Sequence, residues 1–181
     1  MKLEEVSRAV SHALRHEPEK YGLTLDSQGW VEIDDLLAGL KRQGPAWDSV
    51  DRQVLGEMMA TAKKQRHEVS GSRIRAYYGH SVDKPIDRPN SQPPELLFHG
   101  TSPEAWETIR ARGLKPMNRQ SVHLSADRAT ALQVGKRKSN APVILVINAA
   151  GAHAAGVAFA LGNETVWLAD AVPAKFIRLD S

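Results

Sequence analysis

Residues 67–78 read HEVSGSRIRAYY, with Val69 before Gly71-Ser72 and Ile74, Tyr77 and Tyr78 after it. Such residues favour strands, and glycine followed by serine favours a tight turn, so the stretch predicts a β-hairpin. Upstream, apolar residues recur at helical spacing in residues 3–16, in residues 36–40 and again after about residue 48. Three helices followed by a hairpin is the element order of a winged helix, a common nucleic-acid-binding module. The sequence therefore predicts a winged-helix lobe over residues 1–80.

Turn and cap residues set the expected ends of these helices. Pro18 stops the first helix, and the second is expected to end near Gly44-Pro45. Asp48 or Ser49 can cap the third helix. A short extended segment is expected at residues 30–33, after a turn at residues 26–29.

The second half of the chain has a different pattern. Four prolines and no periodic apolar pattern indicate a linker over residues 81–94. A helix is expected from Ser102-Pro103 to Gly113, and another over residues 127–138. Short strands are expected at residues 95–98, 122–125, 142–148, 157–160, 165–169 and 175–179. This mixture predicts an α+β protein whose second lobe covers residues 95–181.

Composition narrows the class of protein. The chain has 181 residues and a formal charge of +3, and it contains no cysteine, which excludes disulfides and thiolate metal sites. No apolar run reaches the length of a membrane span or a signal peptide, so we expect a cytoplasmic protein that does not bind membranes. Nothing suggests an extended self-association surface, so a monomer is expected. The sequence contains neither a Rossmann nor a P-loop motif, and no metal site is expected.

Three short stretches carry groups suited to chemistry. Arg15 and His16 stand at the end of the first helix and can grip a phosphate, although cations there also offset the helix dipole. The run from His99 to Thr101 follows a strand, and its glycine can let a ligand approach the backbone. His123 and Ser125 project from one face of a strand. Each stretch also has a purely structural interpretation as a helix end, a satisfied loop histidine or a half-buried polar pair.

Taken in order, these and other short motifs resemble the NAD-dependent RNA 2'-phosphotransferase family, over nearly the whole chain. The motifs of the first half are Leu14-Arg15-His16-x-Pro18, Gly22-Leu23-x-Leu25-Asp26-x-x-Gly29-Trp30-Val31, Lys64-Gln65-Arg66 and Ile74-Arg75-Ala76-x-x-Gly79-His80-Ser81. Those of the second half are His99-Gly100-Thr101, Gly113-Leu114-x-x-Met117-x-Arg119, Val122-His123-Leu124-Ser125 and Val166-Trp167-Leu168-x-Asp170-x-Val172-Pro173. Each motif is unspecific alone, but the ordered series is highly specific.

The resemblance implies a winged-helix RNA lobe followed by an NAD-binding lobe of the ADP-ribosyltransferase type. It implies transfer of an internal 2'-phosphate from RNA to NAD, through an RNA 2'-phospho-ADP-ribose intermediate. The products would be 2'-OH RNA, ADP-ribose 1'',2''-cyclic phosphate and nicotinamide. The partners would be a 2'-phosphorylated, tRNA-like RNA of the kind made in tRNA splicing, and NAD as co-substrate, without a metal.

The resemblance also assigns roles to residues. The catalytic residues would be Arg15, His16, Arg66 and Arg119. The NAD-binding residues would be His99, Gly100, Thr101, His123, Leu124, Ser125 and Val166. The RNA-binding residues would be Arg15, His16, Arg66, Arg75 and His80. His16 could donate a hydrogen bond or shuttle a proton.

The chain departs from the family pattern at His67, at Tyr77-Tyr78 and at Ser121, where the family tends to have an aromatic residue, Asn-Gln and histidine. Related ADP-ribosyltransferases mark the NAD site with a histidine-tyrosine-glutamate trio, for which this chain has His99, His123 and Val166. Glu164 keeps a second hypothesis open, an ADP-ribosyltransferase acting on nucleic acid or protein, because on a strand it would face the same way as Val166. A third hypothesis, a non-enzymatic winged-helix binder, explains only residues 1–80.

Overall fold

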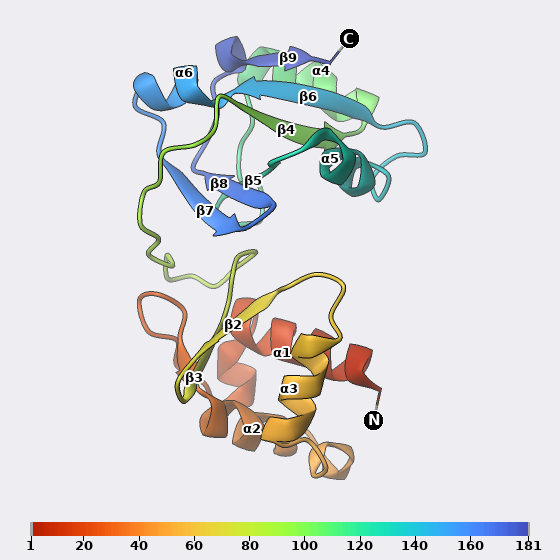
Figure 1. The fold of residues 1–181 in the computed structure, drawn as a ribbon, viewed down its shortest axis with the longest axis vertical. Coiled ribbons are helices and arrows are strands. Elements are labelled where there is room, and N and C mark those ends of the chain that lie inside the picture. The colour runs from red at the N-terminus through yellow and green to blue at the C-terminus, as the bar shows by residue number, and fades with distance from the viewer. Residues whose placement is uncertain (1, 181) are drawn as a thin grey trace. The chain divides into compact units, whose positions relative to one another are not determined.

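The computed structural model describes residues 2–180 and divides the chain into two compact units, residues 1–87 and 88–181 (Figure 1). Helices and antiparallel sheets occur in both units. The predicted α+β class is therefore confirmed. Each unit is described below by itself.

The first unit joins a group of helices to a small sheet. Its α-helices are α1 (Leu3–Arg15), α2 (Ile33–Lys41) and α3 (Arg52–Ala60), with two 3₁₀ turns, η1 (Pro18–Tyr21) and η2 (Pro45–Trp47). Its strands are β1 (Val31–Glu32), β2 (His67–Ser70) and β3 (Arg73–Ala76), which form an antiparallel sheet in the order β1-β3-β2. The predicted hairpin is confirmed, but β3 ends at Ala76, so Tyr77 and Tyr78 follow the strand.

The amphipathic face of α1 builds the core of this unit. Val6, Val10 and Leu14 are fully buried at a spacing of four residues, which places them on one side of the helix. They pack in one cluster with Leu36 and Leu40 of α2. The end of α1 is thereby held against the core, and its last residue is Arg15.

The start of α3 differs from the prediction. Residues 45–47 form the 3₁₀ turn η2, in which Asp48 N–H donates to the Pro45 carbonyl, so Asp48 and Ser49 do not cap α3. Asp51 is the N-cap instead, and its carboxylate accepts from Val54 N–H at 2.9 Å. The prediction failed because proline after glycine starts its own turn before the helix.

The second unit is built on a six-stranded antiparallel sheet with the order β7-β8-β5-β4-β6-β9. The strands are β4 (Leu96–Thr101), β5 (Val122–Ser125), β6 (Val143–Asn148), β7 (Phe159–Asn163), β8 (Val166–Ala169) and β9 (Ile177–Leu179). The helices are α4 (Pro103–Arg112), α5 (Arg128–Gly135) and α6 (Ala149–Ala154), with a 3₁₀ turn η3 (Ala174–Phe176). The predicted strands are present with shifted ends, whereas α6 was not expected.

Local signals account for the helices of this unit. Ser102 caps α4 and accepts from Ala105 N–H at 3.2 Å, as predicted, and Gly113 ends the helix. Gly113 has φ +76° and lies so close to the Val172 carbonyl that a Cβ atom would be 2.3 Å from its oxygen, so glycine is required there. The unexpected α6 is capped by Asn148, which accepts from Gly151 N–H at 2.8 Å.

Backbone bonds hold both sides of the boundary between the units. Asp87 N–H donates to the Ser27 carbonyl at 2.7 Å, within the first unit. Ser91 N–H donates to the Phe159 carbonyl at 2.8 Å, within the second unit. The chain on either side of the boundary is therefore bonded to its own unit.

His67 makes the stability of the first unit depend on pH. Only 4% of this residue is exposed, and its Nε2 lies 3.1 Å from the Ser11 hydroxyl. Burial, reinforced by the positive charges of Arg15 and Arg66, lowers the pKa of His67 to about 3. In the unfolded chain the pKa of a histidine is about 6.5. Between these values the unfolded state binds a proton that the folded state does not, so stability falls as pH falls from about 6.5 towards 3.

We expect His67→Phe to remove this dependence. Below about pH 6 the free energy of unfolding of the wild-type unit should fall more steeply than that of the variant, by up to about 1.4 kcal/mol per pH unit. Urea unfolding at pH 7, 6 and 5, followed by hydrogen exchange of peptides from residues 3–76, measures both slopes. If the unfolding free energies of the two proteins changed with pH at the same rate, the prediction would be wrong. A loss of stability that does not depend on pH leaves this comparison unaffected.

Candidate functional site

Arg15 and Arg66, two of the residues expected to be catalytic, are brought together at the end of α1. The Arg15 guanidinium donates to the Arg66 carbonyl at 3.1 Å. Tyr77 N–H donates to the same carbonyl at 3.0 Å. One carbonyl oxygen thus ties the segment before β2 to the segment after β3 and to the last residue of α1.

An aromatic ring holds two cations at the same place. The Arg15 guanidinium carbon and the Lys64 Nζ each lie 5.7 Å from the centre of the Tyr78 ring. Both are cation–π contacts, in which the negative face of the ring attracts a positive group. Together, Arg15, Lys64, Arg66 and the neighbouring His16 form what we call the cationic cluster. Tyr78 is one of the departures from the family pattern, and here it organises two members of the cluster.

The electrostatic effect of the cluster is visible at His67. The positive charges of Arg15 and Arg66 add to burial in lowering the pKa of His67, so the field at the end of α1 is positive. A positive field with guanidinium donors suits an anion with several acceptor oxygens, such as a phosphate. The cluster can therefore bind a phosphate group.

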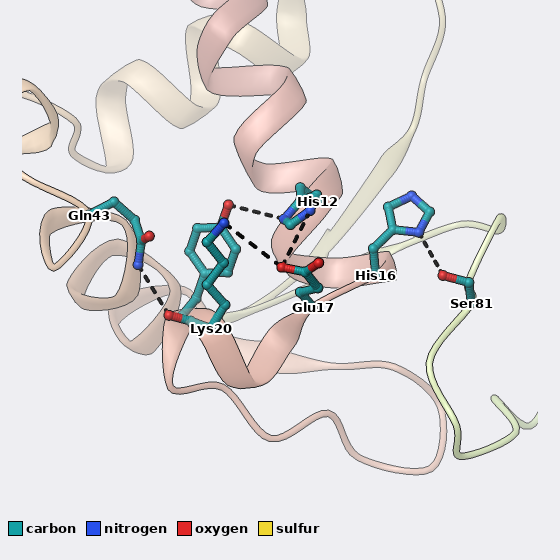
Figure 2. A network of polar contacts seen from close by, with 7 residues as sticks. His12, His16, Glu17, Lys20, Gln43 and Ser81 are labelled. Carbon is teal, nitrogen blue, oxygen red and sulfur yellow. Dashed lines mark hydrogen bonds and ion pairs between the residues drawn. The ribbon is translucent and has the colours of Figure 1, made fainter.

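His16 follows Arg15 as the C-cap of α1 and is exposed. Its Nδ1 lies 2.8 Å from the hydroxyl of Ser81, a contact drawn as a dashed line in Figure 2. His12, one turn earlier, makes different contacts, with the Tyr21 hydroxyl at 3.2 Å and with Glu17 at 3.8 Å (Figure 2). The two histidine rings are 6.0 Å apart.

Two residues expected to bind RNA have other contacts. Arg75 forms an ion pair with Glu68 at 2.7 Å and stacks on the Trp30 ring at 4.4 Å. His80 is only 3% exposed. A Cβ atom on Gly29 would lie 3.4 Å from the His80 ring, so the ring packs against that glycine. Both side chains thus have contacts outside the cationic cluster, and their part in RNA binding stays a prediction.

In the second unit, His99 of β4 and His123 of β5 interact through the backbone. The His99 Nδ1–H donates to the His123 carbonyl at 2.9 Å. Burial, with a smaller contribution from the charge of Lys138, lowers the pKa of His99 although that hydrogen bond opposes the shift. His99 is therefore neutral at physiological pH, and its Nε2 carries a lone pair that can accept from a ligand hydroxyl.

Gly100 has a packing role that differs from the one expected. A Cβ atom there would lie 1.8 Å from the Ala131 carbonyl oxygen and 2.8 Å from the Gly135 backbone nitrogen. Helix α5 thus occupies the space that the missing side chain leaves. The glycine allows the helix to pack on β4, and the expectation that this space serves a ligand was wrong on that side of the strand. Thr101, the next residue, is 1% exposed.

Arg119 is joined to His123. The Arg119 guanidinium donates to His123 Nδ1 at 2.7 Å, so this nitrogen carries the lone pair and Nε2 carries the proton. Arg119 lies just after the turn at Met117, which has φ +58°. The predicted catalytic arginine and one predicted NAD-binding histidine thus form one hydrogen-bonded pair.

The remaining NAD-binding candidates lie on the neighbouring strands. Ser125 pairs with Val166 of β8, and both are buried. Leu124 is 1% exposed and belongs to the hydrophobic core, so its side chain serves packing. His99, His123 and Val166 occupy three adjacent strands, β4, β5 and β8.

Glu164 does not lie on a strand. Strand β7 ends at Asn163 and β8 begins at Val166, and these two residues pair across the turn. Glu164 is exposed in that turn. The expectation that it faces the same way as Val166 was wrong because strand alternation does not continue through a tight turn.

Within residues 2–180, no cluster of three or more histidine, cysteine or acidic side chains could hold a metal ion. In the same range, no helix has both the length and the apolar character needed to cross a membrane. Sequence reasoning gave no role to Lys64, Tyr78 or Ser81, although Lys64 and Ser81 lie inside motifs that carried the resemblance. Their contacts with the cationic cluster depend on the tertiary structure.

Comparison with known proteins identifies the family of this chain. A protein of Acetivibrio thermocellus named "Probable RNA 2'-phosphotransferase" is 47% identical over 176 residues, which cover 97% of this chain and 96% of the relative. Proteins with the same name from Bacillus thuringiensis and Streptomyces coelicolor are 47% and 45% identical, over 97% and 96% of this chain and 94% and 93% of the relatives. Residues 1–171 match the family described as "RNA 2'-phosphotransferase, Tpt1 / KptA family". The chain therefore belongs to the RNA 2'-phosphotransferase family.

Proposed function

We propose that this protein transfers an internal 2'-phosphate from RNA to NAD, leaving 2'-OH RNA, ADP-ribose 1'',2''-cyclic phosphate and nicotinamide. The observation that carries the proposal is the cationic cluster, in which Arg15 and Arg66 are held together by a hydrogen bond beside His16. Family membership supports an RNA 2'-phosphate as the anion that this cluster receives.

The fold is consistent with a division of labour between the two units. Three helices with a hairpin in an antiparallel sheet support a winged-helix RNA-binding unit, and we assign residues 1–80 to it. The second unit, residues 95–181, would be an ADP-ribosyltransferase-like NAD-binding lobe. Its histidines on the adjacent strands β4 and β5 support that assignment.

The donor set of the second unit suits NAD. The neutral His99 presents a lone pair on Nε2 that can accept from a ribose hydroxyl, while its other nitrogen is fixed by the His123 carbonyl. The Arg119–His123 pair offers a cation and an N–H donor for phosphate oxygens. When bound, NAD supplies an electrophilic ribose carbon with a cationic nicotinamide leaving group.

The proposed role of the cationic cluster follows from the charge of the nucleophile. An RNA 2'-phosphate is already anionic, so it needs no general base to attack the ribose carbon. In the second step, the ribose 2''-hydroxyl loses its proton and attacks the phosphate, the bond to the RNA 2'-oxygen breaks, and that oxygen takes up a proton to leave as the RNA 2'-OH. Negative charge grows on the phosphate oxygens during this step. Arg15 and Arg66 would stabilise that charge, which is the kind of electrostatic stabilisation that lowers a barrier most. His16 would donate a hydrogen bond or move a proton.

The first test concerns the co-substrate. Purified protein should convert 2'-phosphorylated RNA to 2'-OH RNA only when NAD is added, and a chelator should not slow the reaction because no metal is required. Product analysis by mass spectrometry should show one ADP-ribose cyclic phosphate for each RNA converted. Equal turnover without NAD, or a strict need for Mg²⁺, would overturn the proposed function.

The second test separates the two chemical steps. Arg15→Ala, His16→Ala or Arg66→Ala should each slow the second step more than the first, because loss of one phosphate donor removes a few kcal/mol where charge develops. RNA 2'-phospho-ADP-ribose should then accumulate as a slower-migrating species on a denaturing gel. Arg119→Ala, which acts in the other unit through its bond to His123, should slow both steps.

Arg52→Ala is the matched control for this test. Arg52 is an arginine of the same unit, but it pairs with Asp34 on the surface, at 2.8 Å. It should leave both steps unchanged. If the three cluster variants stop at substrate without any intermediate, these residues serve binding or the first step, and the proposed division is wrong.

A third test addresses Glu164. Because this residue lies exposed in the β7–β8 turn, Glu164→Gln should leave the reaction nearly unchanged. Steady-state rates with 2'-phosphorylated RNA and NAD measure the effect. A loss of more than about 100-fold, or ~2.7 kcal/mol, would favour an ADP-ribosyltransferase that depends on this glutamate.

A further inference from the structure

Ser81 makes two hydrogen bonds to consecutive residues at the end of α1. Its backbone N–H donates to the Arg15 carbonyl at 2.8 Å. Its hydroxyl lies 2.8 Å from His16 Nδ1. The carbonyl groups at a helix end have no partner within the helix, so the first bond also satisfies one of these acceptors. Both bonds together hold the serine hydroxyl at a defined place against the imidazole.

The two residues before Ser81 fix the path of the chain, and so fix the position of the serine. Gly79 has φ +90°, a conformation that glycine adopts without strain. His80 is buried against Gly29, where a side chain on the glycine would meet the histidine ring at 3.4 Å. The Gly79-His80-Ser81 motif therefore has a structural explanation in which the glycine turns the chain, the histidine anchors it and the serine reaches His16.

The chemistry of a hydroxyl suits a histidine that changes its protonation state. A serine hydroxyl can donate to the lone pair of a neutral imidazole or accept from an imidazolium N–H. In the neutral ring, a hydroxyl that donates to Nδ1 leaves the proton on Nε2, at the opposite edge of the ring. Figure 2 shows that second nitrogen on the side of the ring turned away from Ser81.

We propose that Ser81 is a positioning residue, which holds His16 so that its Nε2–H faces the 2'-phosphate of the RNA. The proposal rests on the proposed function for the identity of the phosphate. His12, which is close to His16, is already occupied by Tyr21 and Glu17, so it does not replace Ser81 in this role. The serine acts only through the imidazole and does not itself touch the substrate.

A double-mutant cycle tests this indirect role. Ser81→Ala should lower kcat by about 10- to 100-fold, since a misplaced catalytic group loses rate on this scale. The KM for NAD should not change. In a His16→Ala background, the same substitution should cost less than about twofold, because the group that it orients is gone. Ser81→Thr keeps the hydroxyl and should restore most of the activity. Ser49→Ala, at an exposed serine of the same unit, is the control and should have no effect.

Spectroscopy tests the positioning without relying on activity. In protein labelled with ¹⁵N-histidine, the signals of His16 are those that disappear in His16→Ala. At a pH where the ring is neutral, wild-type protein should show the His16 proton on Nε2, and Ser81→Ala should show a mixture of the two tautomers. Unchanged His16 signals in Ser81→Ala, or an equal loss of kcat in both backgrounds of the cycle, would overturn the proposal. If wild-type protein does not act on 2'-phosphorylated RNA, the proposed function fails, and the His16 signals still decide the role of Ser81.

Discussion

The carbonyl oxygen of Arg66 accepts hydrogen bonds from the Arg15 guanidinium and from Tyr77 N–H. Through this one acceptor, the end of α1 is tied to both sides of the β2–β3 hairpin. Arg15 and Arg66 are 51 residues apart in sequence, yet they meet because α1 packs its apolar face into the same core as the hairpin. The other contacts of the site are arranged around this junction. This bond fixes the Arg15 side chain against the backbone of Arg66 although the two side chains carry like charges.

The positive charge of the cationic cluster affects the neighbouring residues His67 and Tyr78. His67 lies directly after Arg66 and stays neutral because burial and two guanidinium groups oppose its protonation. Tyr78 meets Arg15 and Lys64 with its ring face, which offsets part of their repulsion. Both residues are departures from the family pattern. His67 adds no positive charge to the cluster, and Tyr78 contacts two of its cations. A bound phosphate would neutralise positive charge that the protein alone does not neutralise.

The second unit holds its polar groups by different means. Gly100 and Gly135 lie where α5 meets β4, and each lacks the side chain that would separate the helix from the strand. This close packing fixes the strand end that carries His99. The His99 ring is then set by the His123 carbonyl, while the His123 ring is set by Arg119. Each imidazole thus has its Nδ1 set by a hydrogen bond within the protein.

Local patterns in the sequence determined most of the elements and the family. Helical spacing of Val6, Val10 and Leu14, the Ser102 cap and the Gly71-Ser72 turn are short-range signals, and the structure agrees with each of them. The ordered motifs likewise name residues whatever the fold around them is. Tertiary structure decided what those residues touch. It placed Ser81 on His16, 65 residues away, gave Gly100 to helix packing and put Glu164 in a turn. Sequence spacing could not reveal these facts, because contacts between distant segments depend on how their apolar faces pack, and periodicity describes only neighbours along the chain.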